Sequence, residues 1–119
     1  MRVLSAHRTP KETVSWAETA HKRGIEVIIC GAGMAAHLAG AVAAHTIVPV
    51  IGVPVGATLG GVDALLSTVQ MPKGVPVATV SMGKAGAINA AVLCAEIFSL
   101  NNSDLVSKLS EFKKNGCML

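Results

Sequence analysis

A long stretch without charged side chains most constrains how this chain can fold. No Asp, Glu, Lys or Arg occurs between Val27 and Val62. Glycine and proline interrupt the stretch every few residues, so its apolar pieces are shorter than the roughly 20 residues that a membrane-spanning helix needs. Short apolar runs separated by turn residues are typical of buried parallel strands alternating with helices of small residues. The stretch therefore predicts the interior of a parallel α/β domain and disfavours a membrane protein.

Composition narrows the class of protein further. Of the 119 residues, 51% are hydrophobic, which is enough apolar surface to exclude a disordered chain. Basic residues exceed acidic residues by 10 to 7, but they are dispersed, and aromatic residues make up only 3%. Nucleic-acid binding usually needs a dense basic stripe and a stacking platform, so we expect no nucleic-acid partner. Charged residues are only 14% of the chain, and we therefore expect other copies to cover part of its surface in a homo-oligomer.

The cysteines indicate a reducing compartment. The chain has three, Cys30, Cys94 and Cys117, and no two of them form a Cys-x-x-Cys pair. This pattern argues against a disulfide framework and against a zinc site. Cys30 and Cys94 lie in apolar runs, so we expect both in the core. With no signal-peptide pattern visible either, we expect a cytoplasmic protein without a bound metal.

The order of patterns predicts a single domain over residues 1–119. Strands are expected over residues 2–4, 26–30, 48–53 and 75–80, and helices over residues 10–23, 34–45, 62–69, 84–100 and about 103–115. Strands that alternate with helices through short connections indicate a three-layer αβα fold with a mostly parallel sheet. Ligands bind such sheets beyond the carboxyl ends of the strands, where the loops 5–9, 31–40 and 54–61 are expected. The last helix could pack on a neighbouring subunit.

The first candidate site is the segment 5–10, where a strand is expected to pass into a helix. A capping box of Thr9 and Glu12 predicts the start of that helix. Free N–H groups and the helix dipole favour an anion there. Arg8 adds a planar donor group suited to a carboxylate or phosphate, and His7 can move a proton near neutral pH. The segment predicts an acidic substrate and acid–base chemistry, with a capped helix carrying surface polar residues as the alternative.

The second candidate is the glycine-rich segment that follows the next strand. Its pattern Gly31-x-Gly33-x-x-Ala36 matches a dinucleotide-binding fingerprint. That fingerprint also needs an acidic residue about 20 positions later, and none ends the following strand, so NAD binding is disfavoured. The glycines still let a ligand approach the backbone closely. Taken alone, His37 in this segment is interpreted as structural, because His is often partly buried without a chemical role.

Six segments in sequence order resemble one known family. They are residues 5–10 (SAHRTP), 32–38 (AGMAAHL), 48–54 (VPVIGVP), 61–67 (GVDALLS), 69–72 (VQMP) and 83–91 (GKAGAINAA). The set is similar to the PurE family, the N5-carboxyaminoimidazole ribonucleotide mutases, which are also the catalytic subunits of phosphoribosylaminoimidazole carboxylase. The segment 83–91 resembles the bacterial mutase class more than the class that uses free carbon dioxide.

The resemblance implies a flavodoxin-like fold assembled as a homo-octamer, with a role in de novo purine biosynthesis. The implied reaction moves the carboxylate of N5-carboxyaminoimidazole ribonucleotide from the exocyclic nitrogen to C4, giving 4-carboxy-5-aminoimidazole ribonucleotide, with neither a metal nor an organic cofactor. By match, His7 would be the general acid and base that helps release carbon dioxide and then takes the C4 proton.

The resemblance also implies a set of substrate-binding residues. It assigns the nucleotide to Ser5, Arg8, the backbone of Ala32 and Gly33, and Leu38, and it places His37 in the wall of the pocket. This implication moves His37 from a structural to a binding interpretation.

The chain departs from the family pattern in three ways. Met34 stands where the family usually has Gly, which would narrow the backbone approach to the ligand, and Ala39 stands where it usually has Pro. The family begins with a strand, a phosphate-binding loop and a helix that do not precede Arg2, so we expect an N-terminally shortened sheet. Two alternatives therefore accompany the mutase: a non-catalytic oligomeric remnant of the family, and a carboxylase that uses free carbon dioxide.

Overall fold

A parallel sheet lies at the centre of the computed structural model, which describes residues 3–56 and 59–118. In this part of the chain the sheet has three strands in the order β1-β2-β3: β1 (Ile28–Gly33), β2 (Val50–Val55) and β3 (Ala78–Thr79). Strand β2 is central, and its pairing with β1 runs in register from Ile28 opposite Val50 to Gly33 opposite Val55.

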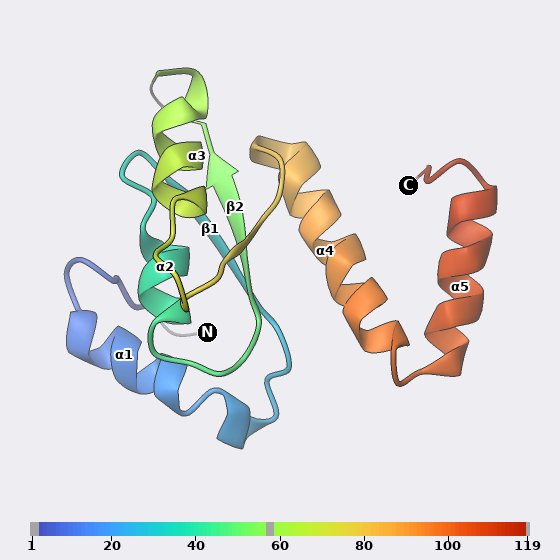
Figure 1. The fold of residues 1–119 in the computed structure, drawn as a ribbon, viewed down its shortest axis with the longest axis horizontal. Helices are drawn as coiled ribbons and strands as arrows, with labels where there is room; N and C mark the ends of the chain where they lie inside the picture. The colour runs from blue at the N-terminus through green and yellow to red at the C-terminus, as the bar shows by residue number, and fades with distance from the viewer. Residues whose placement is uncertain (1–2, 57–58, 119) are drawn as a thin grey trace.

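Helices cover both faces of this sheet. They are α1 (Pro10–Glu18), α2 (Leu38–Ala43), α3 (Val62–Val69), α4 (Gly83–Ser99) and α5 (Ser103–Lys114), with short 3-10 turns η1 (His21–Arg23) and η2 (Leu59–Gly61). Helices α1 to α3 lie on one side of the sheet and α4 on the other, with α5 outside α4 (Figure 1). The three-layer α/β fold with a parallel sheet is confirmed. None of the helices in the described ranges is long and apolar enough to cross a membrane.

The side chains of β2 divide the core into two clusters, because neighbouring residues of a strand point to opposite faces. One cluster lies under α1 and α2 and contains Ala17, Ala20, Ile28, Cys30, Ala39, Val42, Val48 and Val50. The other joins Ile51 and Val53 to Ala90 of α4. The charge-free stretch therefore forms the interior, as expected. Cys30 is buried as expected, whereas Cys94 is only partly buried beside the second cluster.

All four strand predictions need correction, and the strand expected at 48–53 lies two residues later as β2. The expected strand at residues 2–4 is wrong for residues 3–4, which are not paired in the structure, and Arg2 lies outside the described residues. Leu4 instead lines a cavity of about 380 Å³ beside β1. Strand β1 continues through the glycines, because they pair with β2. The expected strand 75–80 shortens to β3, consistent with Pro76, which has no N–H to donate.

Two helices are shorter than expected because of local backbone geometry. Helix α1 ends at Glu18, where the Thr19 hydroxyl donates to the carbonyl oxygen of Ser15 at 2.9 Å, and the chain turns through η1. The helix expected from residue 34 begins only at Leu38, because Met34 has φ 58° in the left-handed region, which a helix cannot accommodate. Helices α3, α4 and α5 begin and end within one residue of their expected bounds.

Candidate functional site

The loop before α1 is closed by hydrogen bonds between its own residues. The N–H of Ser5 donates to Thr9 Oγ1 at 2.8 Å, and the N–H of Thr9 donates to the Ser5 carbonyl oxygen at 2.8 Å. The N–H of Arg8 donates to Ser5 Oγ at 3.2 Å. Residues 5–9 therefore form a tight turn in which the side chains of His7 and Arg8 are exposed.

The predicted capping box is wrong. Thr9 does occupy the N-cap position, followed by Pro10, but its side chain makes no cap hydrogen bond to α1. The Thr9 hydroxyl instead bonds both the N–H and the carbonyl oxygen of Ser5, at 2.8 and 3.1 Å. The residue that was expected to cap the helix therefore holds the shape of the candidate site.

A second turn follows the carboxyl end of β1. After Gly33, Met34 takes its left-handed conformation, and its carbonyl oxygen accepts from the N–H of Ala36 at 2.8 Å. The N–H of His37 donates to the Ala35 carbonyl oxygen at 2.8 Å. His37 then occupies the N-cap position of α2 without a side-chain cap bond, and its side chain is exposed. The chain thus turns sharply across the end of the sheet.

These two turns line one cavity of about 420 Å³. Its described walls are Val3, Leu4, Ser5, Ala6, His7 and Arg8 from the first segment, and Ala32, Gly33, Ala35, Ala36, His37 and Leu38 from the second. All seven residues singled out from the sequence lie on it: Ser5, His7, Arg8, Ala32, Gly33, His37 and Leu38. The third candidate loop, 54–61, contributes none of its described residues, and positions 57 and 58 lie outside the described residues.

The chemistry of these walls favours an anionic ligand. The cavity combines the guanidinium of Arg8 with the imidazoles of His7 and His37, and none of its described lining residues is acidic. A guanidinium binds carboxylate and phosphate oxygens in a planar, two-pronged geometry. Across residues 3–56 and 59–118, no three His, Cys, Asp or Glu side chains are grouped so as to hold a metal ion.

Sequence reasoning missed the apolar part of the cavity. Leu4, Ala6, Ala35 and Ala36 carry no chemical motif, yet they complete the walls between the polar side chains. Their position beside the predicted residues was the available signal, since a loop that lines a cavity does so with consecutive residues. Apolar walls and a few convergent polar groups are the usual composition of a small-molecule site.

Comparison with known proteins agrees with this geometry. The family model described as AIR carboxylase matches residues 1–117. The N5-carboxyaminoimidazole ribonucleotide mutase of Bacillus subtilis (strain 168) is 60% identical over 115 residues, which are 96% of this chain and 71% of that protein. The mutase of Escherichia coli (strain K12) is 54% identical over 115 residues, covering 96% of this chain and 68% of that protein. The resemblance to the PurE family is therefore confirmed, and the chain belongs to the AIR carboxylase family.

Proposed function

We propose that this chain is a mutase of de novo purine biosynthesis, which converts N5-carboxyaminoimidazole ribonucleotide to 4-carboxy-5-aminoimidazole ribonucleotide. Relatives that carry the mutase name are 54 and 60% identical to it over nearly its whole length. The observation that carries the proposal is the shared cavity, in which His7 and Arg8 stand opposite the turn after β1. That arrangement supplies one proton donor and acceptor beside a site for an anion.

His7 can serve both halves of the reaction. In the first half, the bond between the exocyclic nitrogen and the carboxylate carbon breaks, its electron pair stays on nitrogen, and nitrogen takes a proton from the His7 imidazolium. In the second half, ring carbon C4 attacks the released carbon dioxide, and the neutral imidazole takes the C4 proton. One imidazole therefore returns to its starting state without a net gain or loss of protons, because it acts first as the acid and then as the base.

The remaining residues would bind and enclose the substrate. Arg8 would hold an anionic oxygen of the carboxylate or the phosphate, and the N–H groups of the turn after Gly33 would approach the ligand closely. The apolar walls beside His7 would hold carbon dioxide between the two halves of the reaction, because that molecule is uncharged. The carboxylate moves within one molecule, so the proposed chemistry needs neither a metal nor an organic cofactor.

We also propose that the chain acts as a cytoplasmic homo-oligomer, with an octamer as the expected form. Helix α3 supports this proposal, because Val62, Leu66 and Val69 are about half exposed and lie on one face of the helix. An apolar helix face of this kind is typically covered by a partner. Light scattering that shows a stable monomer would contradict the oligomer.

The His7→Asn variant tests the catalytic assignment. Asn keeps a polar side chain but cannot transfer the proton, so we expect turnover to fall by at least about 100-fold. Calorimetric binding of the stable product, 4-carboxy-5-aminoimidazole ribonucleotide, should remain within about threefold, since Arg8 still binds the anion. His45→Asn is the matched control, because His45 is exposed and lies outside the cavity.

The same assay separates the mutase from its alternatives. Retained turnover in the His7→Asn variant would contradict the role of His7. A wild-type chain that binds the product without converting it would indicate the non-catalytic remnant. Consumption of the uncarboxylated imidazole ribonucleotide with dissolved carbon dioxide, and not of the N5-carboxylated substrate, would indicate the carboxylase.

A further inference from the structure

Gly40 lies in α2, three residues after His37, and it is buried. Glycine inside a helix is less favourable than alanine, because it loses more backbone freedom on folding. The backbone of Gly40 is helical, so a left-handed conformation does not explain the glycine. Its neighbours do, because they occupy the space that a side chain would need.

The His37 imidazole lies directly over Gly40. A Cβ atom added at position 40 would stand 2.4 Å from His37 Cε1 and 2.8 Å from His37 Nδ1. The same atom would stand 2.9 Å from Met71 Sδ, which comes from the segment after α3. Packed carbon atoms lie about 3.5–4.0 Å apart, so no side chain fits there while the ring and the sulfur keep their positions.

We propose that Gly40 and Met71 are positioning residues that hold the His37 imidazole at the wall of the ligand cavity. This inference rests on the proposed function, in which His37 lines the nucleotide pocket. An exposed imidazole at a helix N-cap without a cap bond would otherwise change rotamer freely. A ring that rests on bare helix backbone, beside a thioether, is ordered before the ligand arrives, which lowers the entropic cost of binding.

The thioether of Met71 is well suited to pack beside the His37 ring. Methionine sulfur is polarisable and makes favourable contacts at the edges of aromatic rings. Met71 is partly buried, and its Sδ atom borders the same space over Gly40 as the ring does, from a different segment than α2. The ring therefore lies between its own helix and the segment after α3, so its position depends on how that segment packs on α2.

The Gly40→Ala variant tests the proposal by filling this space. In NMR spectra of the wild type, we expect cross-peaks from the His37 Hε1 proton to the Met71 methyl group and to Gly40 Hα. In the variant we expect these contacts to be lost and the Hε1 signal to move. Binding of 4-carboxy-5-aminoimidazole ribonucleotide should weaken by about tenfold, and KM should rise accordingly. The kcat should stay within about threefold, because His7 is not displaced.

Gly31→Ala is the matched control, because Gly31 is not among the residues that line the cavity, although its segment was a candidate site. The nearest atom to its added Cβ would be Val55 Cγ2 at an ordinary 3.9 Å. Its ring signals and product affinity should match the wild type. A double-mutant cycle then asks whether Gly40 acts through the imidazole. In a His37→Ala background, Gly40→Ala should weaken binding by less than about twofold. A full further loss there would overturn the positioning role, because it would show an effect on the fold alone.

Three further outcomes are informative, and the last two keep the inference separate from the proposed function. If Gly40→Ala fails to fold, Met71→Ala adds no bulk and should still release the ring, so an unchanged Hε1 signal in that variant would overturn the proposal. If the wild type lacks turnover but shows the expected ring contacts, the proposed function fails and the placement of the ring stands. If turnover is present and Gly40→Ala changes neither ring signals nor affinity, the positioning role fails.

Discussion

The sheet with α1 to α3, here called the body, and the α4–α5 hairpin (residues 83–114) are held together in different ways. In the body, Ile51 of β2 is 0% exposed and Thr68 of α3 is 2% exposed. In the hairpin, no residue of α5 is buried, and the buried residues of α4 are Gly86 and Ala90. Helix α5 packs mainly on α4 and lies outside it (Figure 1).

The difference shows how unevenly a chain of this composition distributes its core. Between the two helices of the hairpin lies an apolar groove of about 360 Å³, lined by residues that include Ile88, Val92, Leu109 and Phe112. Asn102 caps the N-terminus of α5: its side-chain oxygen accepts hydrogen bonds from the N–H groups of Asp104 and Leu105 at 3.1 and 3.2 Å. Local capping therefore supports α5 more than burial does, so we expect α5 to open at a lower free energy than the body.

Gly86→Ala should have the largest effect, because Gly86 lies where the hairpin meets the body. An added Cβ would stand 1.6 Å from the Ser81 carbonyl oxygen and 3.3 Å from Val53 Cγ1. The carbonyl oxygen belongs to the backbone directly before α4, where no side-chain rotation can relieve the clash, so the start of α4 must shift against that segment and against Val53. We expect the free energy of unfolding in urea to fall by about 4 kcal/mol or more.

Gly31→Ala serves as the control for Gly86→Ala, with an expected change below about 1 kcal/mol. If Gly86→Ala cost no more than that control, α4 would be free to shift on the sheet. The body and the hairpin would then be joined far more loosely than the close contact at Ser81 indicates.

Cys30 should give the body a larger pH dependence than Cys94 gives the hairpin. Burial of this thiol, which is 5% exposed, raises its pKa from 9.0 to about 11. The folded state therefore favours the neutral thiol, and this contribution to stability is complete below the unfolded pKa and is lost as the pH rises from about 9 to about 11. The loss amounts to about 3 kcal/mol, since each pKa unit corresponds to about 1.4 kcal/mol.

Urea denaturation of Cys30→Ala between about pH 8 and about pH 11 measures this contribution as a flatter pH dependence than in the wild type. Cys94→Ala is the matched variant in the hairpin, where partial burial also raises the thiol pKa. We expect a smaller change there, because Cys94 is less buried. Equal changes in the two variants would contradict the difference in burial between the two regions.

The sequence predicts the hairpin and the interior of the body for physical reasons that are local. Helices α3, α4 and α5 follow from periodicity and end signals within the chain itself. The sequence does not predict where β1 ends. Its last residues, Ala32 and Gly33, have weak strand preference and are extended only by pairing with Pro54 and Val55. Register with a partner strand is a property of two segments, and neither segment shows it alone.

In the candidate site, too, the sequence predicts some features and not those that depend on contacts between distant segments. The rule that strand ends in a parallel sheet share one edge predicts that His7 and Arg8 lie beside the turn after β1. They do line one cavity with that turn, but the residues before them are not paired in the sheet, so the rule gives the right place without the expected strand. The sequence predicts that the Thr9 hydroxyl caps α1, but in the structure it bonds the backbone of Ser5. Both partners are local, and the sequence pattern alone does not choose between them. The His37 imidazole and Met71 Sδ border the same space over Gly40 from segments far apart in the sequence, so no local pattern could predict this arrangement.

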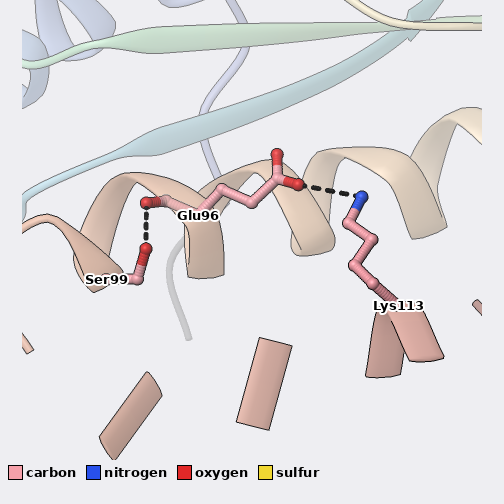
Figure 2. Close-up of polar contacts among 3 residues, drawn as sticks. All are labelled: Glu96, Ser99 and Lys113. Carbon is pink, nitrogen blue, oxygen red and sulfur yellow. Dashed lines mark hydrogen bonds and ion pairs between the residues drawn. The ribbon is translucent and has the colours of Figure 1, made fainter. Parts of the chain in front are cut away.

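The ion pair between Glu96 and Lys113 should have the smallest effect. The Lys113 ammonium lies 3.2 Å from a Glu96 carboxylate oxygen. The pair joins α5 to α4 across the hairpin (Figure 2). The two side chains are 41 and 57% exposed, so water screens their attraction, and holding both in one geometry costs side-chain entropy. We expect Lys113→Ala to lower the free energy of unfolding by at most about 0.5 kcal/mol.

Lys114→Ala is the control for Lys113→Ala, because Lys114 shares the last turn of α5 and the same interaction with the helix dipole. The difference between the two variants should vanish at about 1 M salt, where charges on the surface are screened within about 3 Å. A loss above about 1 kcal/mol that persisted in salt would mean that this pair, and not the apolar groove, closes the hairpin. The hairpin would then share with the body a dependence on specific close contacts, and the contrast between the two regions would weaken.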